Sequence, residues 1–441
     1  MMLHISGKKT IKYWVALSIF AIALVMMGYA VSRENFAIQL LLFSLAIVAY
    51  WKLYRFFRNG HFGVFAGVMT ALGLRLVLLF SIPVLSDDFY RFIFDGQLLK
   101  SGINPYAFLP EDAFQQLQVP NSRYWEDLLT GMNSLGYYSV YPPLHQLFFF
   151  FSAWAGSSLL GNILILRLVI LAFEGLNLLL IHRILKLWGL PLSRLWLYAF
   201  NPLVILELTG NLHFEALVIT GLLGMLYGLS LSKVSYSTLG WVWAVGVKLS
   251  PLMLGPFLIK VWGKSKVFHF LLWSAVWMGI FLLPLFVTGN FSNFWQSFRL
   301  YQSNFEFNAS VWYLIRWVSG FWMDYNPLVY VGPFLSLFAL VGILAISFFH
   351  KIKEPKHVAS AVVWIYLVYL LLQNVVHPWY ILPAFVVGVL VGNRVFLFWT
   401  GLVFLSYSAY SVTPVSENWM LIFLEYAVLI GVIILELRKK P

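Results

Sequence analysis

The chain has 441 residues, of which 61% are hydrophobic and 10% are charged, whereas an average soluble domain carries about 25% charged residues. This composition excludes a soluble globular fold, and the net charge of +12 is explained by membrane orientation before nucleic-acid binding. The chain has no cysteine, which excludes disulfides and thiolate chemistry.

Apolar segments of about 17 to 25 residues recur along the chain, the length with which an α-helix crosses a hydrocarbon core about 30 Å thick. These segments are continuous and not alternating, which favours helices over a β-barrel. The predicted fold is therefore all-α, a polytopic transmembrane bundle of about 11 to 14 helices in a single domain over residues 1–441. The predicted spans are Tyr13–Val31, Phe36–Trp51, Phe62–Leu85, Ile163–Ile181, Leu195–Leu208, Phe214–Leu231, Val267–Val287, Leu328–Phe349, Val358–Leu372, Ile381–Val391, Phe396–Ser411 and Trp419–Leu437.

Two further apolar segments, Tyr141–Leu160 and Trp241–Val261, contain prolines, so each is a short, re-entrant or full span. When neither crosses and both termini are cytoplasmic, most lysines and arginines lie on the cytoplasmic side; when both cross, this bias weakens. We prefer the first arrangement, with the first span as an uncleaved helix and not a signal peptide. It predicts two extracytoplasmic loops, 86–141 and the aromatic-rich 288–326.

The first of these loops opens with two adjacent carboxylates, Asp87 and Asp88, directly after an apolar segment. Asp88, Arg91 and Asp95 are spaced i, i+3, i+7 and share one face if the stretch is helical. Arg91 can then pair with one carboxylate and leave the other free to accept a proton. The alternative is a solvated loop beside the membrane, but the acids alternate with aromatic residues, which favours a functional site.

Two turn motifs complete this loop, Asn104 within Gly-Ile-Asn-Pro-Tyr and Tyr141 within Tyr-Pro-Pro. Their prolines set rigid turns where the chain re-enters the membrane, and taken alone they require no catalytic role.

Polar residues also interrupt the apolar runs further along the chain. Glu207, Asn211, His213 and Glu215 fall close together at a predicted bilayer edge, where ionisable groups are costly and usually line a cavity or pair with a partner. A single buried histidine is more often a satisfied core residue, but a cluster of four polar groups favours a site.

Lys248 lies within the apolar segment Trp241–Val261, where it either holds a phosphate as a point charge or extends to the interface. His377, Trp379 and Tyr380 follow a predicted span at the outer face, either as ordinary interfacial residues or as a binding surface for a sugar or a lipid headgroup. We interpret both groups as candidate substrate-binding residues.

Metal and nucleotide chemistry are not expected. His213, Glu215 and His377 lack the spacing of a two-histidine zinc site. The sequence also has no Gly-x-Gly-x-x-Gly or Walker-type lysine motif, which argues against direct use of a nucleotide sugar or ATP. A donor would therefore come through the membrane.

Taken together, these motifs resemble the bacterial polyprenyl-phosphate-mannose-dependent mannosyltransferases of the GT-C fold, over roughly Phe62 to Tyr380. One departure is Glu215, where the family often carries Asp. The matching blocks, in family order, are Asp88-Phe-Tyr-Arg-Phe with Asp95-Gly, Gly102-Ile-Asn-Pro-Tyr106, Tyr141-Pro-Pro, Asn201-Pro-Leu with Gly210-Asn-Leu-His213, Lys248-Leu-Ser-Pro and His377-Pro-Trp-Tyr380.

The resemblance implies transfer of mannose from a polyprenyl-phosphate-linked donor to a glycan or glycolipid acceptor, with inversion and without metal or cofactor. The protein would lie in the bacterial inner membrane, surrounded by membrane lipids, with its site on the extracytoplasmic face. Asp88 would be the general base, with Asp87 as the second candidate, and Arg91, Lys248, His213 or His377 would stabilise the leaving phosphate.

The alternatives are a lipid-linked-sugar transporter or flippase, and a polysaccharide polymerase or ligase. The clustering of acidic residues at one face and the absence of an evident inverted repeat favour the transferase over a transporter. The position of the Asp-Asp pair directly after an apolar segment favours it over a polymerase.

Overall fold

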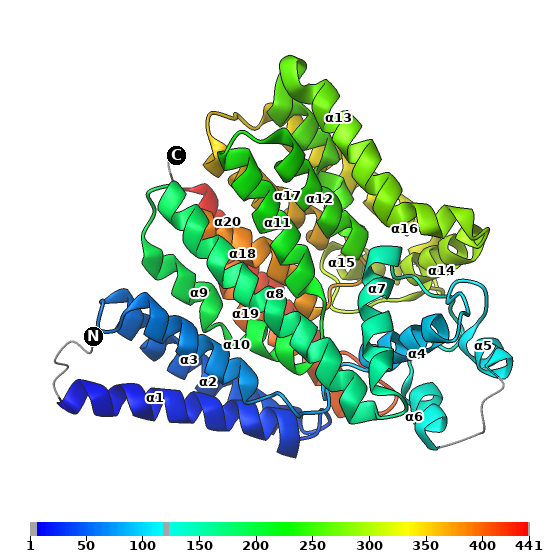
Figure 1. Cartoon of the computed structure of the whole chain (residues 1–441), viewed down its shortest axis with the longest axis horizontal. Helices are drawn as coiled ribbons and strands as arrows, with labels where there is room; N and C mark the ends of the chain where they lie inside the picture. Colours follow the sequence, from blue (N-terminus) through cyan, green and yellow to red (C-terminus); the bar gives the residue numbers. More distant parts are fainter. Residues whose placement is uncertain (1–6, 118–122, 440–441) are drawn as a thin grey trace.

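The computed structural model describes residues 7–117 and 123–439, and Figure 1 shows them as a bundle of helices. Within these ranges every regular element is a helix, and β-type pairing is limited to an isolated bridge between Phe307 and Val375. This confirms the predicted all-α class.

The first half of the chain contains two π-helical segments, η1 and η4, and two short 3-10 segments, η2 and η3. Its elements are α1 (Gly7–Val25), η1 (Met26–Ala30), α2 (Phe36–Arg58), α3 (Val64–Leu76), α4 (Asp88–Lys100), α5 (Pro110–Gln116), α6 (Arg123–Gly131), α7 (Pro143–Ser152), η2 (Ala153–Ala155), α8 (Leu159–Leu187), η3 (Leu192–Arg194), α9 (Leu195–Ala199), α10 (Pro202–Val204), η4 (Ile205–Gly210) and α11 (Glu215–Ser230).

The second half contains three 3-10 segments, η5, η6 and η7. Its elements are α12 (Val234–Val247), η5 (Ser250–Leu254), α13 (Gly255–Val287), α14 (Phe291–Asn304), α15 (Val311–Ser319), α16 (Leu328–Phe349), α17 (Pro355–Leu371), η6 (Pro378–Ile381), α18 (Leu382–Val391), α19 (Val395–Leu402), η7 (Val403–Ser411) and α20 (Trp419–Leu437).

The described residues include six helices that are long and apolar enough to cross a membrane, together with one bent pair and four shorter apolar helices. These segments agree with the predicted range of helices, and the protein is an integral membrane protein. Buried residues make up only 17% of the most apolar stretch of Ser250–Val287, and also of Leu328–Phe349. The exposed apolar surface of these helices is the surface that lipid covers.

The predicted span Phe62–Leu85 is wrong in its second half, because α3 ends at Leu76 and the chain then leaves the helix. Pro83 has no backbone N–H for a helical bond and disfavours a helical conformation in the residue before it. Backbone groups after Leu76 form hydrogen bonds with a side chain instead. The Tyr29 hydroxyl donates to the carbonyl of Val77 at 3.0 Å and accepts from the N–H of Phe80 at 3.2 Å.

The segment Tyr141–Leu160 does not form one helix. Its helix α7 has 10 residues and is therefore about 15 Å long, half of what a hydrocarbon core requires.

The segment Trp241–Val261 does not form one helix either, because the chain reverses direction within it. The Trp241 indole N–H, on α12, donates to the carbonyl of Pro251 at 2.8 Å, so the chain reverses direction around Lys248. Lys248 itself is extended, with φ −149°. The helix α13 is then broken at Gly263, whose φ of 58° suits glycine. Both segments are thus interrupted helices, and that neither crosses the membrane stays a prediction.

The α11–α12 hairpin is held together by glycines at its interface. A Cβ on Gly221 would lie 2.7 Å from the carbonyl oxygen of Gly240, and a Cβ on Gly240 would lie 2.3 Å from the backbone nitrogen of Met225. Small residues of this kind let two helix backbones approach closely in a membrane. This packing places Glu215, the first residue of α11, beside Lys248, which directly follows α12.

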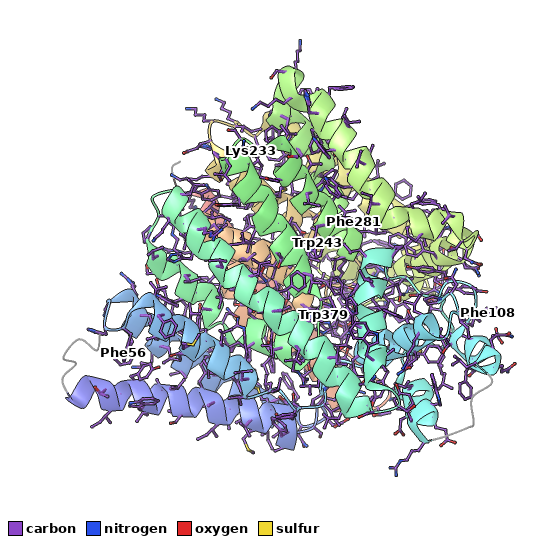
Figure 2. All side chains as sticks on the ribbon, in the orientation of Figure 1. Phe56, Phe108, Lys233, Trp243, Phe281 and Trp379 are labelled. Atoms are coloured by element: carbon purple, nitrogen blue, oxygen red, sulfur yellow. The ribbon has the colours of Figure 1, made fainter. Side chains whose placement is uncertain are left out.

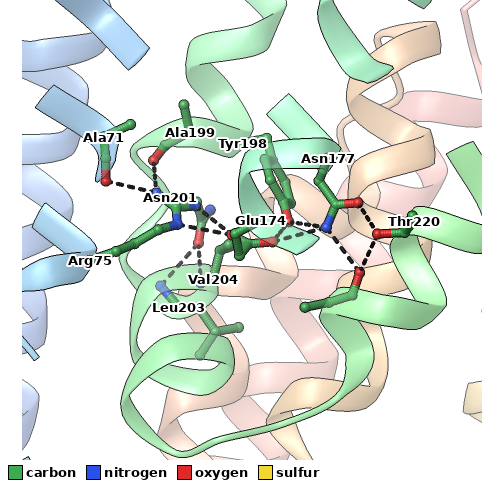
Figure 3. Close-up of polar contacts among 11 residues, drawn as sticks. Ala71, Arg75, Glu174, Asn177, Tyr198, Ala199, Asn201, Leu203, Val204 and Thr220 are labelled. Atoms are coloured by element: carbon green, nitrogen blue, oxygen red, sulfur yellow. Dashed lines mark hydrogen bonds and ion pairs between the residues drawn. The ribbon is translucent and has the colours of Figure 1, made fainter. Parts of the chain in front are cut away.

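A buried polar network joins α3, α8, α9 and α11, as Figure 3 shows. Arg75 donates to Glu174 from Nε at 2.9 Å and from Nη2 at 2.7 Å, and both side chains have zero exposure. The Tyr198 hydroxyl and the Asn177 amide complete the hydrogen bonding of Glu174, and Thr220 donates to Asn177 at 2.6 Å. Charges in an apolar interior need such partners, so Arg75 has a structural role.

Candidate active site

The irregular segment between α3 and α4 carries the two candidate carboxylates, and other elements hold it in place. The N–H of Leu85 donates to the side-chain oxygen of Asn211 at 3.2 Å. Arg167 donates to the carbonyl of Leu79 at 2.7 Å and to those of Thr209 and Gly210 at 2.7 and 3.0 Å. Arg167 thus ties this segment to the end of η4.

Asp88 is the first residue of α4 and is partly exposed. Among the residues that the structure describes, its carboxylate accepts one long contact, of 3.5 Å, from the side-chain amide of Asn133. Although its side chain is partly exposed, desolvation by the surrounding protein raises the pKa of Asp88 to about 6. Asn133 and the positive charge of Lys248 act in the opposite direction, and the charges of Glu215 and Asp87 raise the pKa further. A carboxylate with weak hydrogen bonding and a raised pKa is suited to accept a proton near neutral pH.

Asp87 lies next to Asp88 but in a different environment. Its carboxylate forms an ion pair with Arg33 at 2.7 Å, and both side chains are 29% exposed. Arg33 comes from the segment between η1 and α2, and its guanidinium also lies 5.3 Å from the ring centre of Tyr410.

Lys248 and Glu215 form an ion pair at the end of the α11–α12 hairpin. The ammonium lies 3.9 Å from the centre of the Tyr380 ring, an attractive cation–π arrangement. The Tyr380 hydroxyl contacts the hydroxyl of Tyr301, on α14, at 2.8 Å. The charge of Lys248 is therefore shared between a carboxylate and an aromatic ring, and its side chain is 35% exposed.

Three aromatic rings are stacked beside this ion pair. Trp379 lies between His213, at 3.6 Å between ring centres, and His377, at 4.4 Å. Figure 2 shows Trp379 near the middle of the molecule. Burial lowers the pKa of His377 to about 3, so His377 is neutral and contributes no positive charge.

The backbone that carries His213 is itself irregular. The bent pair consists of Pro202–Gly210 and Glu215–Ser230, and the chain bends by 116° between them. Leu212, in this break, has φ 62°, which is uncommon for a leucine. Glu207 accepts from Tyr407 at 2.6 Å and from Asn211 at 3.3 Å, and its carboxylate lies 3.4 Å from His213 Nε2. This arrangement fixes the break in the helix.

Arg91 and Asp95, on α4, and Asn104, after α4, have hydrogen-bond partners of their own. Arg91 pairs with Asp95 at 2.7 Å, their side chains are 3% and 0% exposed, and Asp95 also accepts from Ser139 and Gln146. Asn104 accepts from the N–H of Tyr106, beyond the far end of α4, which is about 20 Å long. Their predicted contact with substrate stays a prediction, and the observed contacts are structural.

Tyr141 packs edge-on against Phe92, with 5.1 Å between ring centres. The negative charge of Asp88 adds to the effect of burial in raising the pKa of Tyr141, so the two groups are electrostatically coupled.

Sequence reasoning missed several residues near Asp88, because tyrosines, an asparagine and an arginine near membrane surfaces are common and carry no motif. Arg33 was the most detectable, as a cation in a short connection on the predicted outer side. The missed residues are Arg33, Asn133, Tyr301, Tyr407 and Tyr410.

A groove with a volume of about 590 Å³ lies elsewhere. Its aromatic lining, with Trp317, Phe321 and Trp419, lies near the first residues of α16 and α20, where tryptophan is common at membrane interfaces. Across the described ranges, no group of three or more His, Asp or Glu side chains has the geometry of a metal site.

The sequence of this chain is similar to those of a family of known proteins. The family model described as alpha-(1->6)-mannopyranosyltransferase, N-terminal domain, matches residues 13–264. The chain is 28% identical over 247 residues to alpha-(1->6)-mannopyranosyltransferase A of Mycobacterium tuberculosis, covering 50% of this chain and 44% of the relative. It is 27% identical over 206 residues to the Corynebacterium glutamicum protein of the same name, covering 44% and 38%. The chain thus matches less than half the length of these relatives. No solved structure matches the chain.

Proposed function

The chain belongs to the alpha-(1->6)-mannopyranosyltransferase family, and from this premise we propose that it transfers mannose from a polyprenyl-phosphate donor to a glycan or glycolipid acceptor. The proposed product carries an α-(1→6) linkage, as in the names of the relatives. The reaction takes place at the extracytoplasmic face of a bacterial inner membrane, in a single domain. The site draws on residues on both sides of position 264, where the family match ends.

The observation that carries the proposal is the contrast between Asp88 and the other acids around it. Asp87 is paired with Arg33, Glu215 with Lys248, and Asp95 with Arg91. Asp88 has no cationic partner among the described residues and accepts one long amide contact. Asp88 is therefore the carboxylate in this region that is available to take a proton.

In the proposed reaction the acceptor hydroxyl oxygen attacks the anomeric carbon, while its proton passes to Asp88. The bond between that carbon and the phosphate oxygen breaks, and polyprenyl phosphate leaves with the electron pair. Lys248 supports the negative charge of the leaving phosphate, which an aligned cation can stabilise in a site of low polarity. One base and one cation suffice for this inverting displacement, and we propose that it is independent of metal.

The experiment that tests the proposal uses membranes containing the full chain, polyprenyl-phosphate [¹⁴C]mannose and endogenous acceptors. We expect radiolabel in acceptor, unchanged by excess EDTA, and released by an α-(1→6)-specific mannosidase. Label that crosses the membrane while still attached to the donor, with none in acceptor, would contradict the transferase and favour a transporter.

Transfer should depend on pH through Asp88. A general base acts when unprotonated, so activity is retained above the pKa of about 6 and is lost as the pH falls through it. We expect kcat/KM to fall about tenfold between pH 7 and pH 5. A profile that stays flat down to pH 4.5 would exclude Asp88 as the titrating base.

Replacement of Lys248 should affect both donor binding and stability. Lys248→Ala leaves Glu215, which is 4% exposed, without its cation. Because Lys248 is itself 35% exposed, we expect a cost of about 1–3 kcal/mol, less than for a fully buried pair. Lys248→Met combined with Glu215→Gln removes both charges and serves as the control. We expect the double variant to recover the thermal stability but to keep a donor KM raised about tenfold or more. A normal KM in the double variant would remove Lys248 from phosphate binding.

A further inference from the structure

The segment between η1 and α2 brings a cation to the two candidate carboxylates from a distant part of the chain. Arg33 lies 54 residues before Asp87, and the two side chains meet at 2.7 Å. The segment is fixed by Gln39, which donates to the carbonyl of Val31 at 2.8 Å and is 1% exposed. The Arg33 guanidinium therefore has a defined position.

Resting on the proposed function, we infer that Arg33 is a positioning residue, which binds Asp87 and neutralises its charge so that Asp88 alone acts as the base. Arg33 does not touch the reacting atoms in this role. It acts through Asp87.

The reason is the repulsion between adjacent carboxylates. Two like charges a few ångströms apart oppose each other's ionisation, and the proton is then shared or moves to the more basic group. Asp87 is held by Arg33, whose guanidinium also lies against the Tyr410 ring. The positive charge of Arg33 partly cancels the field of the Asp87 carboxylate at Asp88.

The other groups that face Asp88 do not provide this cancellation. The charged ones are Glu215, which opposes ionisation of Asp88, and Lys248, which favours it, and these two are paired with each other. The uncharged ones are the Asn133 amide and the tyrosines whose phenols are coupled to Asp88, namely Tyr141, Tyr301, Tyr380, Tyr407 and Tyr410. Arg33 is thus the cation that acts on Asp87.

The test measures mannosyl transfer against pH for wild type, Arg33→Ala, Arg33→Lys and the double variant Arg33→Ala with Asp87→Asn. In Arg33→Ala we expect the acid limb to move to higher pH by about half a unit or more, because the free Asp87 charge now acts on Asp88. Arg33→Lys keeps the positive charge and should restore most of the wild-type limb. The double variant removes both charges and should return the limb to its wild-type position or below.

A purely structural role for Arg33 gives a different result. Activity would then fall in Arg33→Ala with an unmoved acid limb, and the added Asp87→Asn would not restore the profile; this outcome overturns the inference. Where Arg33→Ala is unstable in detergent, Arg33→Gln provides the same loss of charge with a polar side chain. Absence of transfer by wild type would overturn the proposed function and this inference together, whereas wild-type transfer with an unmoved limb overturns the inference alone.

Discussion

Replacement of Asp88 by asparagine is expected to reduce mannosyl transfer about 10³-fold while the protein still folds and inserts into the membrane. General-base catalysis contributes about 10²- to 10⁴-fold to a rate, and an amide of nearly the same shape does not accept the proton. The fold should tolerate the change, because within residues 7–117 and 123–439 the Asp88 carboxylate accepts one side-chain hydrogen bond, at 3.5 Å from Asn133.

The matched control is Asp87→Asn at the same level in the membrane. Asp87 carries the same charge one residue away but is held by Arg33, so we expect its variant to keep activity within about tenfold of wild type. Radiolabelled transfer and donor binding should be measured for both variants. If Asp88→Asn retained full activity while Asp87→Asn lost it, the base would be Asp87, and the environments of the two acids would have been interpreted the wrong way round.

The largest expected loss of stability follows from Glu174→Ala. This change leaves the fully buried guanidinium of Arg75 without its carboxylate, and breaking a buried ion pair from one side costs about 3–5 kcal/mol. In detergent we expect the apparent Tm to fall by about 5–10 °C.

The control for that prediction is the double variant Arg75→Met with Glu174→Leu, which replaces the pair by apolar side chains of similar size. Replacement of a buried pair by apolar residues is often neutral or stabilising, so the double variant should recover most of the lost Tm. A single and a double variant of equal Tm would show that Glu174 stabilises the bundle through Tyr198 and Asn177 and not through Arg75.

The helices that depend on local hydropathy could be predicted closely from the sequence. Leu328–Phe349 and Trp419–Leu437 were predicted with the bounds that α16 and α20 have in the structure. Both are predominantly apolar and are flanked by polar residues, so the length of the apolar segment sets the length of the helix.

The path of the chain near the site could not be predicted in the same way. The segment after Leu76 is as apolar as a helix interior, and it leaves the helix because Tyr29, Arg167 and Asn211 supply hydrogen bonds to its backbone. These partners are 48 to 126 residues away in the chain. Hydropathy contains no information on such distant pairings.

The same limit applied to the candidate site. The motifs identified Asp88, Lys248, Glu215 and the aromatic residues after His377 as polar or aromatic groups in costly positions. Which of them pair is decided by tertiary packing, and the Lys248–Glu215 pair depends on the contact between α11 and α12. The partner of Asp87 was missed because Arg33 belongs to another connection altogether.

The glycine contact between α11 and α12 sets the angle between the two helices at a point away from the candidate active site. Glu215 lies six residues before Gly221, and Lys248 lies eight residues after Gly240. The glycine contact is therefore about 9 and 12 Å from the two charged residues along the helices. A methyl group added at Gly221 or Gly240 tilts one helix against the other and increases the distance between the Glu215 carboxylate and the Lys248 ammonium. The distance between these two charges therefore depends on interface glycines that no substrate touches. A screen for variants with altered donor preference should include this helix interface as well as the site itself.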